Sequence, residues 1–595
     1  MNAIRAFLRW VSCAIVRELP LLVFLSIFAI VPIWFSSPEP AQYPAFPLVM
    51  THILPQALAV AIPLCLVASL RRLVWYVVYA LGCLLFFGEL LCLFLQHSRI
   101  LSSIAIVVRQ TNAAESAEYL GTAWPGIFTA TGCMVAVVAI TLLADKMWRK
   151  SLSKRLTDVI SRYPNLGVIM GIFVLVALVF GVCKVNHEVK THEKYWTRVP
   201  YALTTTSAPV VYGFVIDDTF FGVYQKRITD LEKAMADIQA DTSVAKDSLT
   251  IIYVIGETFG RHRSSLYGYP LETNPRLSEL KADSSLITFD NVVAYSNRTL
   301  ELLMPLLSLY DVECPESAGK VPLFPGVLRG AGYGVGYYDN QSPIMDAGKF
   351  DFGCTYFMGS PVLRKAFADG YSKSIEQYDG DFIARYPVPH DRSRTLAVYH
   401  LMGQHVAFDK RSTPESRRFT AASYDTIYPF EPNQAAVMAD YDNATRYNDS
   451  ILNDLIESVR NHCSAVIYVP DHGDEVYDYR DHTGRVLDCT EPGTIKVVHE
   501  VPAMIWLSDE YRRRYPGDVE ALRKNIHKPL YNTDISHTIL DLAGVGSPYF
   551  RPDLSLLREG GGRHDRVILG TFRYDRRRAE VDSVKLRYER ARLRD

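Results

Sequence analysis

Residues 249–263 read LTIIYVIGETFGRHR, a short apolar run rich in β-branched residues that ends in a glycine and a cluster of ionisable side chains. The same pattern returns in TLAVYHLMGQH (residues 395–405) and in AVIYVPDHGDE (residues 465–475). Apolar strands of this kind are typical of the buried centre of a mostly parallel sheet. Ligands of such sheets bind beyond the carboxyl ends of the strands, so three ionisable strand ends predict one shared site. The sequence therefore predicts an α/β fold with a soluble α/β/α domain around a mostly parallel central sheet.

The chain before this domain has a different character. The 595 residues carry 63 basic and 64 acidic side chains, a balance that argues against a nucleic-acid partner. Most of these charges lie in the last two thirds of the chain, and the first third is apolar. Five apolar segments there are long enough, or nearly so, to cross a bilayer core with about 20 residues each. They are residues 21–35, 53–70, 73–95, 124–143 and 166–182.

The basic residues between these segments predict their orientation. Arg5 and Arg9 precede the first segment, Arg71 and Arg72 separate the second from the third, and six basic residues lie between the fourth and the fifth. Such an excess of Lys and Arg marks the cytoplasmic side. Five crossings then place the residues after about Lys184 in the periplasm of a Gram-negative cell. The sequence predicts a multi-pass protein of the bacterial inner membrane with a periplasmic catalytic domain.

We expect three parts in the chain. Residues 1–183 form the transmembrane domain of five helices, and residues 184–245 form a membrane-proximal connector rich in aromatic side chains. An ordinary packed linker is an equally good interpretation of the connector. Residues 246–595 form the catalytic domain, with a highly charged tail or helix after Arg573.

Metal-ligating side chains gather at the ends of the predicted strands. They are Glu257, His400, His405, Asp471 and His472, with His499 before a further apolar run. Carboxylate and imidazole groups both bind zinc, so an Asp–His pair after a strand is a plausible metal half-site. Each residue alone has an ordinary structural explanation, such as a carboxylate at a helix start. Their convergence at strand ends favours a shared site.

A candidate nucleophile lies in NVVAYSNRTLELLMP, residues 291–305. Residues Val292–Ala294 are typical of a strand, and Leu300–Leu307 of the first turns of a helix that Pro305 interrupts early. Thr299 then lies at or near a helix N-terminus, where backbone N–H groups and the helix dipole favour an anion such as a transferring phosphoryl group. A simple N-cap role for Thr299 fits the sequence equally well.

Together these stretches resemble the phosphoethanolamine transferases of the alkaline-phosphatase/sulfatase superfamily. Further matches are SSLYGYPLETNPRL (residues 264–277), YDNATRYNDSIL (residues 441–452) and HEVPAMIWLS (residues 499–508). The resemblance covers nearly the whole chain, including the five apolar segments. It implies a sulfatase-like catalytic domain whose catalytic zinc ion is bound by Glu257, Thr299, Asp471 and His472.

The resemblance also implies roles for other residues. Thr299 corresponds to the nucleophile that takes up phosphoethanolamine. His405 and His499 match positions that contact the phosphate group or a second zinc ion, and His400 matches the first histidine of an HxxGxH motif. Asn340 matches an asparagine near the phosphoryl group.

The implied reaction moves phosphoethanolamine from phosphatidylethanolamine through a phospho-threonine intermediate to a cell-envelope glycolipid or glycan. The acceptor is the lipopolysaccharide core or lipid A. The SLYGYP motif is more similar to the sequences of members that modify core sugars. The stretch QSPIMDAG after Asn340 lacks the lysine and cysteines that are frequent in lipid-A-modifying members. Two alternatives stay open: a phosphoglycerol transferase of the lipoteichoic-acid-synthase type, and a membrane sensor or binding protein that has lost catalysis.

The ten cysteines add one prediction. None forms a CxxC pair, so a thiolate zinc site is not expected. Four lie in the soluble part, where an exported domain could form disulfides. Cys314 and Cys354 are the predicted pair.

Overall fold

The computed structural model describes residues 2–21, 23–24, 28, 71–96, 113–191, 218–342, 356–425, 427, 430–485 and 489–591. Their contacts divide the chain into two compact units, Met1–Thr219 and Phe220–Asp595. The predicted boundaries at 183 and 245, with a separate connector between them, stay predictions. The predicted segments 21–35 and 53–70 lie mostly or wholly outside the described residues.

The first unit is helical. Its described helices are α1 (Asn2–Arg17), α5 (Arg71–Gln96), α7 (Ala113–Met147), α8 (Ser153–Arg162) and α9 (Pro164–Thr191). Within the described residues, two helical stretches are long and apolar enough to cross a membrane, Trp75–Phe94 and Trp124–Lys150. A third candidate is the pair formed by α8 and the first part of α9, which is bent by 110°. These helices agree with three of the predicted segments, and the total of five crossings stays a prediction.

Close packing of α1 against α9 depends on small residues. A Cβ atom on Gly171 would lie 2.5 Å from the Leu8 carbonyl oxygen, so only glycine allows the two backbones this approach. The Ser12 hydroxyl donates to the Gly167 carbonyl at 2.5 Å, one turn away on α9. At the other end of α1, the buried Glu18 carboxylate lies 3.0 Å from the Arg149 guanidinium. A close backbone approach and a hydrogen bond therefore join α1 to α9, and an ion pair joins the end of α1 to Arg149.

The second unit is built on a seven-stranded sheet in the order β2–β8–β7–β1–β6–β4–β5. The strands are β1 (Leu249–Gly256), β2 (Leu286–Phe289), β4 (Gly334–Asp339), β5 (Gly370–Tyr371), β6 (Arg394–His400), β7 (Ser464–Pro470) and β8 (Ala503–Leu507). All neighbouring pairs are parallel except those of β8, which runs antiparallel to β7 and to β2. The predicted mostly parallel sheet is confirmed, with one reversed strand. The central strand β1 is buried at every position, as its continuous apolar sequence indicates.

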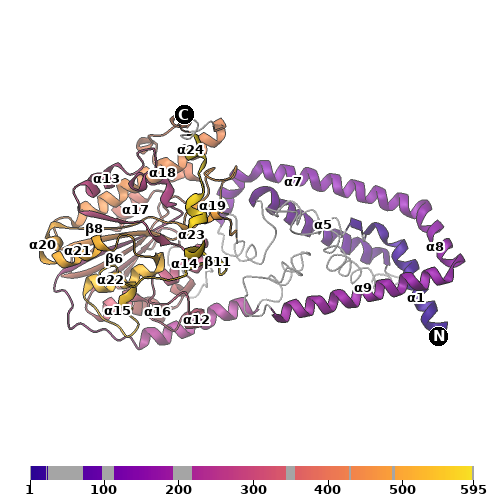
Figure 1. Cartoon of the computed structure of the whole chain (residues 1–595), viewed down its shortest axis with the longest axis horizontal. Helices are drawn as coiled ribbons and strands as arrows, with labels where there is room; N and C mark the ends of the chain where they lie inside the picture. The colour runs from indigo at the N-terminus through magenta and orange to yellow at the C-terminus, as the bar shows by residue number, and fades with distance from the viewer. Residues whose placement is uncertain are drawn as a thin grey trace. The chain divides into compact units, whose positions relative to one another are not determined.

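Helices cover both faces of this sheet (Figure 1). One face carries α13 (Pro275–Ala282), α17 (Asp379–Arg385) and α18 (Pro432–Val459), and the other carries α15 (Phe324–Gly330), α16 (Pro361–Phe367) and α22 (Ile535–Ala543). The helices α20 (Asp509–Arg514) and α21 (Pro516–Lys524) follow β8. This three-layer arrangement leaves the carboxyl ends of the parallel strands as the place where loops can build a site.

The helix before the sheet belongs to this unit. It is α12, at Asp218–Ala236, and it lies inside the segment predicted as a connector. Two of its side chains, Leu231 and Met235, are buried. Its Tyr224 ring meets Tyr356 edge-on at 4.7 Å between centroids. The helix therefore contributes to the core of the catalytic unit.

The end of the described chain also packs against the domain. It forms α23 (Tyr574–Ser583) and α24 (Arg587–Ala591), in agreement with the helical alternative for the charged tail. Tyr574, Val581 and Leu586 are buried, so these helices are not merely solvated. The predicted disulfide is not supported: Cys314 is a free, exposed thiol, and Cys354 lies outside the described residues.

Candidate active site

Two adjacent strands supply the centre of the site. Glu257 directly follows β1, and Asp471 and His472 directly follow β7. The register pairs Gly256 with Pro470, and the Asp471 N–H donates to the Gly256 carbonyl at 3.0 Å. The residues that follow the two strands therefore emerge side by side, as the sequence pattern predicted.

Thr299 joins this centre from a different segment. It is the first residue of α14 (Thr299–Leu306), which follows the short strand β3 (Val292–Val293). Arg298 occupies the N-cap position, so the N-cap interpretation of Thr299 is wrong. The helix also continues through Pro305 to Leu306, where the sequence predicted an early interruption. Pro305 has no N–H to donate to the Glu301 carbonyl, and the Tyr295 hydroxyl donates to that carbonyl instead.

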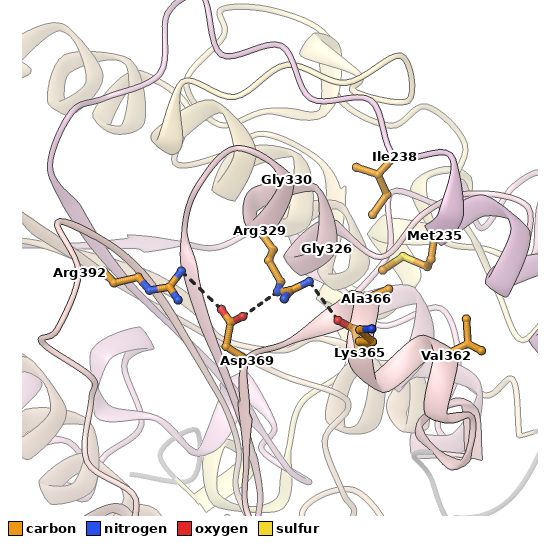
Figure 2. Close-up of a pocket in the computed structure, with 10 residues that line it drawn as sticks. All are labelled: Met235, Ile238, Gly326, Arg329, Gly330, Val362, Lys365, Ala366, Asp369 and Arg392. Atoms are coloured by element: carbon orange, nitrogen blue, oxygen red, sulfur yellow. Dashed lines mark hydrogen bonds and ion pairs between the residues drawn. The ribbon is translucent and has the colours of Figure 1, made fainter.

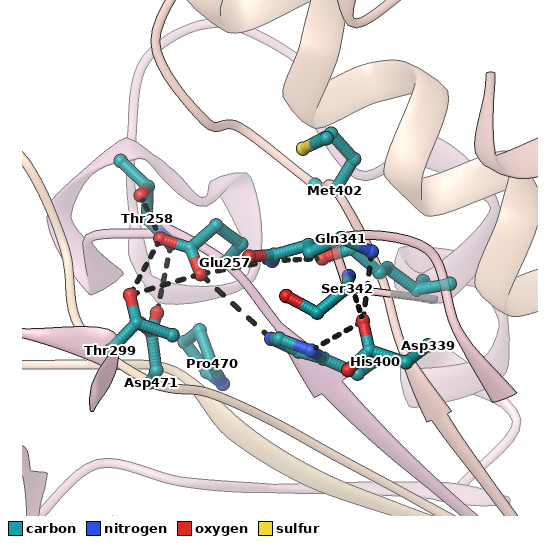
Figure 3. A network of polar contacts seen from close by, with 12 residues as sticks. Glu257, Thr258, Thr299, Asp339, Gln341, Ser342, His400, Met402, Pro470 and Asp471 are labelled. Carbon is teal, nitrogen blue, oxygen red and sulfur yellow. Dashed lines mark hydrogen bonds and ion pairs between the residues drawn. The ribbon is translucent and has the colours of Figure 1, made fainter. Parts of the chain in front are cut away.

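The Thr299 hydroxyl is surrounded by metal-ligating groups (Figure 3). Its Oγ1 donates a hydrogen bond to Asp471 Oδ2 at 2.7 Å. The same oxygen lies 3.3 Å from Glu257 Oε2 and 3.4 Å from His472 Nε2. All four residues predicted as zinc ligands are thus brought together around one hydroxyl.

The donor set suits a zinc ion. Ligand atoms of Glu257, Asp471 and His472 lie within 4.8 Å of one another, and all three side chains are fully buried. The His472 Nδ1–H donates to its neighbour, the Gly473 carbonyl, at 3.0 Å. The lone pair of His472 is therefore on Nε2, the nitrogen that faces Thr299. Two carboxylates, a correctly oriented imidazole and a hydroxyl fit the oxygen and nitrogen ligands that zinc takes.

The electrostatics of Glu257 and Asp471 also favour a bound cation. Burial, with the nearby Asp471 charge, raises the pKa of Glu257. Burial also opposes ionisation of Asp471, but the charge of His472 and hydrogen bonds from His472 and Thr299 bring its pKa below the usual value. Two buried carboxylates in contact need a nearby cation if both are to be ionised. A divalent ion between them meets that need.

Neighbouring residues orient the ligands. The Gln341 amide donates to Glu257 Oε2 at 3.1 Å and to the Leu401 carbonyl at 2.8 Å. The Thr258 hydroxyl donates to Glu257 Oε1 at 2.7 Å, and its backbone N–H donates to Asp471 Oδ1 at 3.1 Å. Thr258 adopts a φ of 61°, an uncommon conformation that a threonine keeps only where the surroundings hold it. The sequence interpretation missed both residues, although Thr258 directly follows Glu257.

Two predicted substrate-binding residues, His400 and Asn340, contact other protein groups and not Thr299 itself. His400 Nδ1 lies 3.1 Å from Asp339, and its Nε2 lies 4.0 Å from Glu257. Burial opposes protonation of His400, but Asp339 raises its pKa above the usual value. The Asn340 amide donates to Asp379 at 2.8 Å and its oxygen accepts the Glu376 N–H at 2.7 Å. Both ends of the Asn340 side chain are therefore used within the protein.

His405 and His499, the other two predicted substrate-binding residues, each have a ring nitrogen that the described residues leave unused. Both are buried, and within the described part of the chain His405 Nδ1 and His499 Nε2 have no hydrogen-bond partner. The other nitrogen of His499 donates to the Ala294 carbonyl at 2.8 Å, which leaves a lone pair on Nε2. Burial lowers the pKa of both imidazoles to about 3. A buried polar atom without a partner is costly unless a ligand satisfies it.

A surface pocket of 710 Å³ lies apart from these residues (Figure 2). In it Asp369 lies between Arg329, at 2.8 Å, and Arg392, at 3.9 Å. Its lining residues are Met235, Ile238, Gly326, Arg329, Gly330, Val362, Lys365, Ala366, Asp369 and Arg392. None of them belongs to the group around Thr299.

Comparison with known proteins agrees with this geometry. The sulfatase family model matches residues 250–545. The phosphoethanolamine transferase EptC of Escherichia coli K12 is 25% identical over 508 residues, which is 82% of this chain and 80% of that protein. EptA of the same strain, also a phosphoethanolamine transferase, is 25% identical over 322 residues, 51% of this chain and 55% of that one.

A solved structure extends the likeness to the whole fold. The integral membrane protein lipooligosaccharide phosphoethanolamine transferase A from Neisseria meningitidis aligns with a TM-score of 0.56 at 15% identity. The alignment covers 93% of this chain and 99% of that one. Residues 250–545 of this chain therefore match the sulfatase family in sequence.

Proposed function

We propose that this protein is a zinc-dependent phosphoethanolamine transferase that uses Thr299 as its nucleophile. The donor is phosphatidylethanolamine, and the acceptor is the lipopolysaccharide core or lipid A. The observation that carries the proposal is the position of Thr299 Oγ1, 2.7 Å from Asp471 and within 3.4 Å of Glu257 and His472. The names of the relatives EptC and EptA support phosphoethanolamine as the transferred group over glycerol phosphate.

The ligands of the zinc ion in this proposal are Glu257, Thr299, Asp471 and His472. A zinc ion bound there would lower the pKa of the Thr299 hydroxyl and neutralise charge on the phosphoryl oxygens. The buried donor set and the lone pair on His472 Nε2, which faces the other ligands, support this assignment.

The protein's own groups then carry out two displacements. Thr299 Oγ1 attacks phosphorus, and the bond between phosphorus and the diacylglycerol oxygen breaks. The hydroxyl proton already lies on the hydrogen bond to Asp471 and leaves along it, to end on the departing diacylglycerol oxygen. A hydroxyl oxygen of the acceptor, or an oxygen of its protonated phosphate, next attacks the phosphorus carried by Thr299. The bond between phosphorus and the Thr299 oxygen breaks, and that oxygen takes the proton that the acceptor loses.

The surroundings of Thr299 suit a phosphoryl group. The N-terminus of α14 offers backbone N–H groups to an anion. The neutral His405 and His499 imidazoles, each with a buried nitrogen that has no partner in the described structure, would contact the phosphate group or a second zinc ion. His400 lies 4.0 Å from Glu257, and we propose that it acts on the substrate through this carboxylate. Asn340 is also a proposed substrate-binding residue, and it would reach the phosphoryl group by giving up its hydrogen bonds to Asp379 and to the Glu376 N–H.

The proposed location is the bacterial inner membrane, with five crossings by residues 1–183 and the domain after residue 245 in the periplasm. A membrane anchor raises the effective concentration of donor and acceptor, since both are carried by lipids. The two apolar helical stretches at Trp75–Phe94 and Trp124–Lys150 support a multi-pass anchor.

The test is a covalent mass shift on one peptide. We expect full-length protein with zinc and phosphatidylethanolamine, but no acceptor, to gain one phosphoethanolamine on the peptide that contains Thr299. Thr299→Ala should give no adduct, and Thr299→Ser should keep part of the activity because the hydroxyl remains. The control is Thr571→Ala, at an exposed threonine outside the site.

Other outcomes would identify the alternatives. A glycerol phosphate adduct would indicate the phosphoglycerol transferase. A folded protein without bound zinc and without adduct would indicate the sensor. A fully active Thr299→Ala variant would refute the nucleophile assignment. Mass spectrometry of lipid A and of core sugars from cells with and without the gene would then identify the acceptor.

A further inference from the structure

An arginine that the sequence motifs did not single out reaches into the site. Arg485 lies in the loop after β7 and is partly buried. Its Nη1 donates to His472 Nε2, and the same nitrogen donates to the Asn297 carbonyl at 3.3 Å. Asn297 precedes Thr299 by two residues, so Arg485 connects the proposed metal ligand with the segment that carries the nucleophile.

The contact with His472 uses the nitrogen that faces the other ligands. Because His472 Nδ1–H donates to the Gly473 carbonyl, Nε2 has only its lone pair to offer. This Nε2 lies 3.0 Å from Asp471 Oδ2 and 3.7 Å from Glu257 Oε1. A metal ion bound by these carboxylates and His472 would use that same lone pair. The Arg485 N–H and the metal ion therefore compete for one acceptor.

Within the part of the chain that the structure describes, the Arg485 guanidinium forms no ion pair in direct contact with a carboxylate, although its charge favours the ionised forms of Glu257, Asp471 and Asp474. This sets it apart from Arg480 on the same loop, which lies 2.8 Å from Glu491. It also differs from Arg263, whose guanidinium lies 2.8 Å from Asp478. Arg485 makes its hydrogen bonds to a ring nitrogen and a carbonyl, neither of which is an anion. No carboxylate in direct contact therefore fixes the guanidinium, which can turn towards an anion beside Thr299.

A guanidinium is well suited to that anion. Its planar fork of N–H donors matches the oxygens of a phosphoryl group, which it can bind through two parallel hydrogen bonds. A hydrogen-bond donor aimed at charge that develops in the transition state contributes more to rate than to ground-state binding.

We propose that Arg485 is a phosphoryl-binding residue that leaves His472 Nε2 when zinc binds and turns to the phosphoryl oxygens of the donor. The Asn297 carbonyl is the tether that keeps the guanidinium beside Thr299 during this change. The inference rests on the proposed function, because it takes the metal ligands and the nucleophile from it.

The experiment separates metal binding from phosphoryl transfer in the full-length protein. The variant is Arg485→Gln, and the matched control is Arg480→Gln, on the same loop but outside the site. Zinc affinity is measured with zinc alone by competition with a chromophoric chelator. Transfer is measured as the single-turnover rate of adduct formation on Thr299 with phosphatidylethanolamine and saturating zinc.

We expect opposite changes in the two measurements. Arg485→Gln should bind zinc about 2- to 10-fold more tightly, because one competing hydrogen bond is gone. Adduct formation should be slower by about 10²-fold, as for the loss of one donor to the developing charge. Arg485→Lys should recover part of the rate, since the charge remains but the fork is lost. Arg480→Gln should match the wild type in both measurements.

The other outcomes overturn the inference. Weaker zinc binding together with slower transfer in Arg485→Gln would mean that Arg485 only supports the fold of the loop. Wild-type values in both measurements would mean that it takes no part. A wild-type protein that binds no zinc or forms no adduct would refute the proposed function itself, a failure that the wild-type measurements reveal before any variant is compared.

Discussion

Gly473 offers a direct test of how the backbone positions His472. A Cβ atom at this position would lie 2.5 Å from the Val497 carbonyl oxygen and 2.8 Å from Gly260 Cα. Both contacts are to backbone atoms, which cannot move aside as the end of a flexible side chain can. The Gly473 N–H also donates to the Val498 carbonyl at 2.7 Å, so the residue is held from two directions.

Gly473→Ala should therefore push the segment that carries His472 away from its neighbours. Overpacking of this kind costs about 1–3 kcal/mol of unfolding free energy. Because His472 is the adjacent residue, we expect zinc affinity to fall at least 10-fold, as it does when the residues that orient a ligand are disturbed. Denaturant titration and zinc competition on the full-length protein measure the two effects.

The matched control is Gly517→Ala. A Cβ atom on this residue of α21 would meet no other atom within 4 Å, so the substitution should cause no loss of stability or zinc affinity. If Gly473→Ala keeps wild-type stability and wild-type zinc affinity, the close backbone contacts do not determine the position of His472, and this reasoning fails.

Three further predictions concern the ligands and the fold. Gln341→Leu should slow transfer about 10- to 100-fold, because Glu257 loses the hydrogen bond that orients it, and single-turnover kinetics of adduct formation would check this. A chelator should abolish transfer by the wild type and added zinc should restore it, whereas His472→Ala should stay inactive at the same zinc concentration while its circular dichroism remains native. Burial lowers the pKa of His537 from 6.5 to about 4, so the unfolded chain binds this proton more readily. The contribution of His537 to the free energy of unfolding should be fully present above pH about 6.5, and the free energy of unfolding should fall by up to roughly 3 kcal/mol towards pH 4. A plot of unfolding free energy against pH should be flatter in this range for His537→Gln.

Local sequence patterns were enough to find the strands that lead into the site. The apolar runs at 249–255, 395–399 and 465–469 correspond to β1, β6 and β7 within one or two residues at each end. The ionisable residues at their ends do converge, because neighbouring parallel strands end at the same edge of the sheet. A strand that is buried on both faces is a continuous run of apolar residues, and this pattern can be recognised without knowledge of distant contacts.

Residues whose position depends on distant contacts were harder to predict. Gln341 contacts Glu257 only because β4 lies beside β6, and its own sequence neighbours give no sign of it. Asn340 was assigned to the phosphoryl group by resemblance, yet its amide is bonded to Asp379, 39 residues later in the chain. The reversed direction of β8 was also not evident, since an apolar run has the same pattern in either direction.

The separation of the proposed ligands along the chain has a consequence for the order in which the site can form. Thr299 and Asp471 are in contact although 172 residues separate them, and Glu257 precedes Thr299 by a further 42. At a synthesis rate of about 5–20 residues per second, the first two ligands exist for about 10–30 s before the last two are made. A nascent or truncated chain therefore has carboxylate and hydroxyl groups but no cavity that retains metal. Under the proposed function, zinc would be bound only after both pairs of ligands have been synthesised and brought together, so bound zinc would report that the whole domain had been translated and had folded.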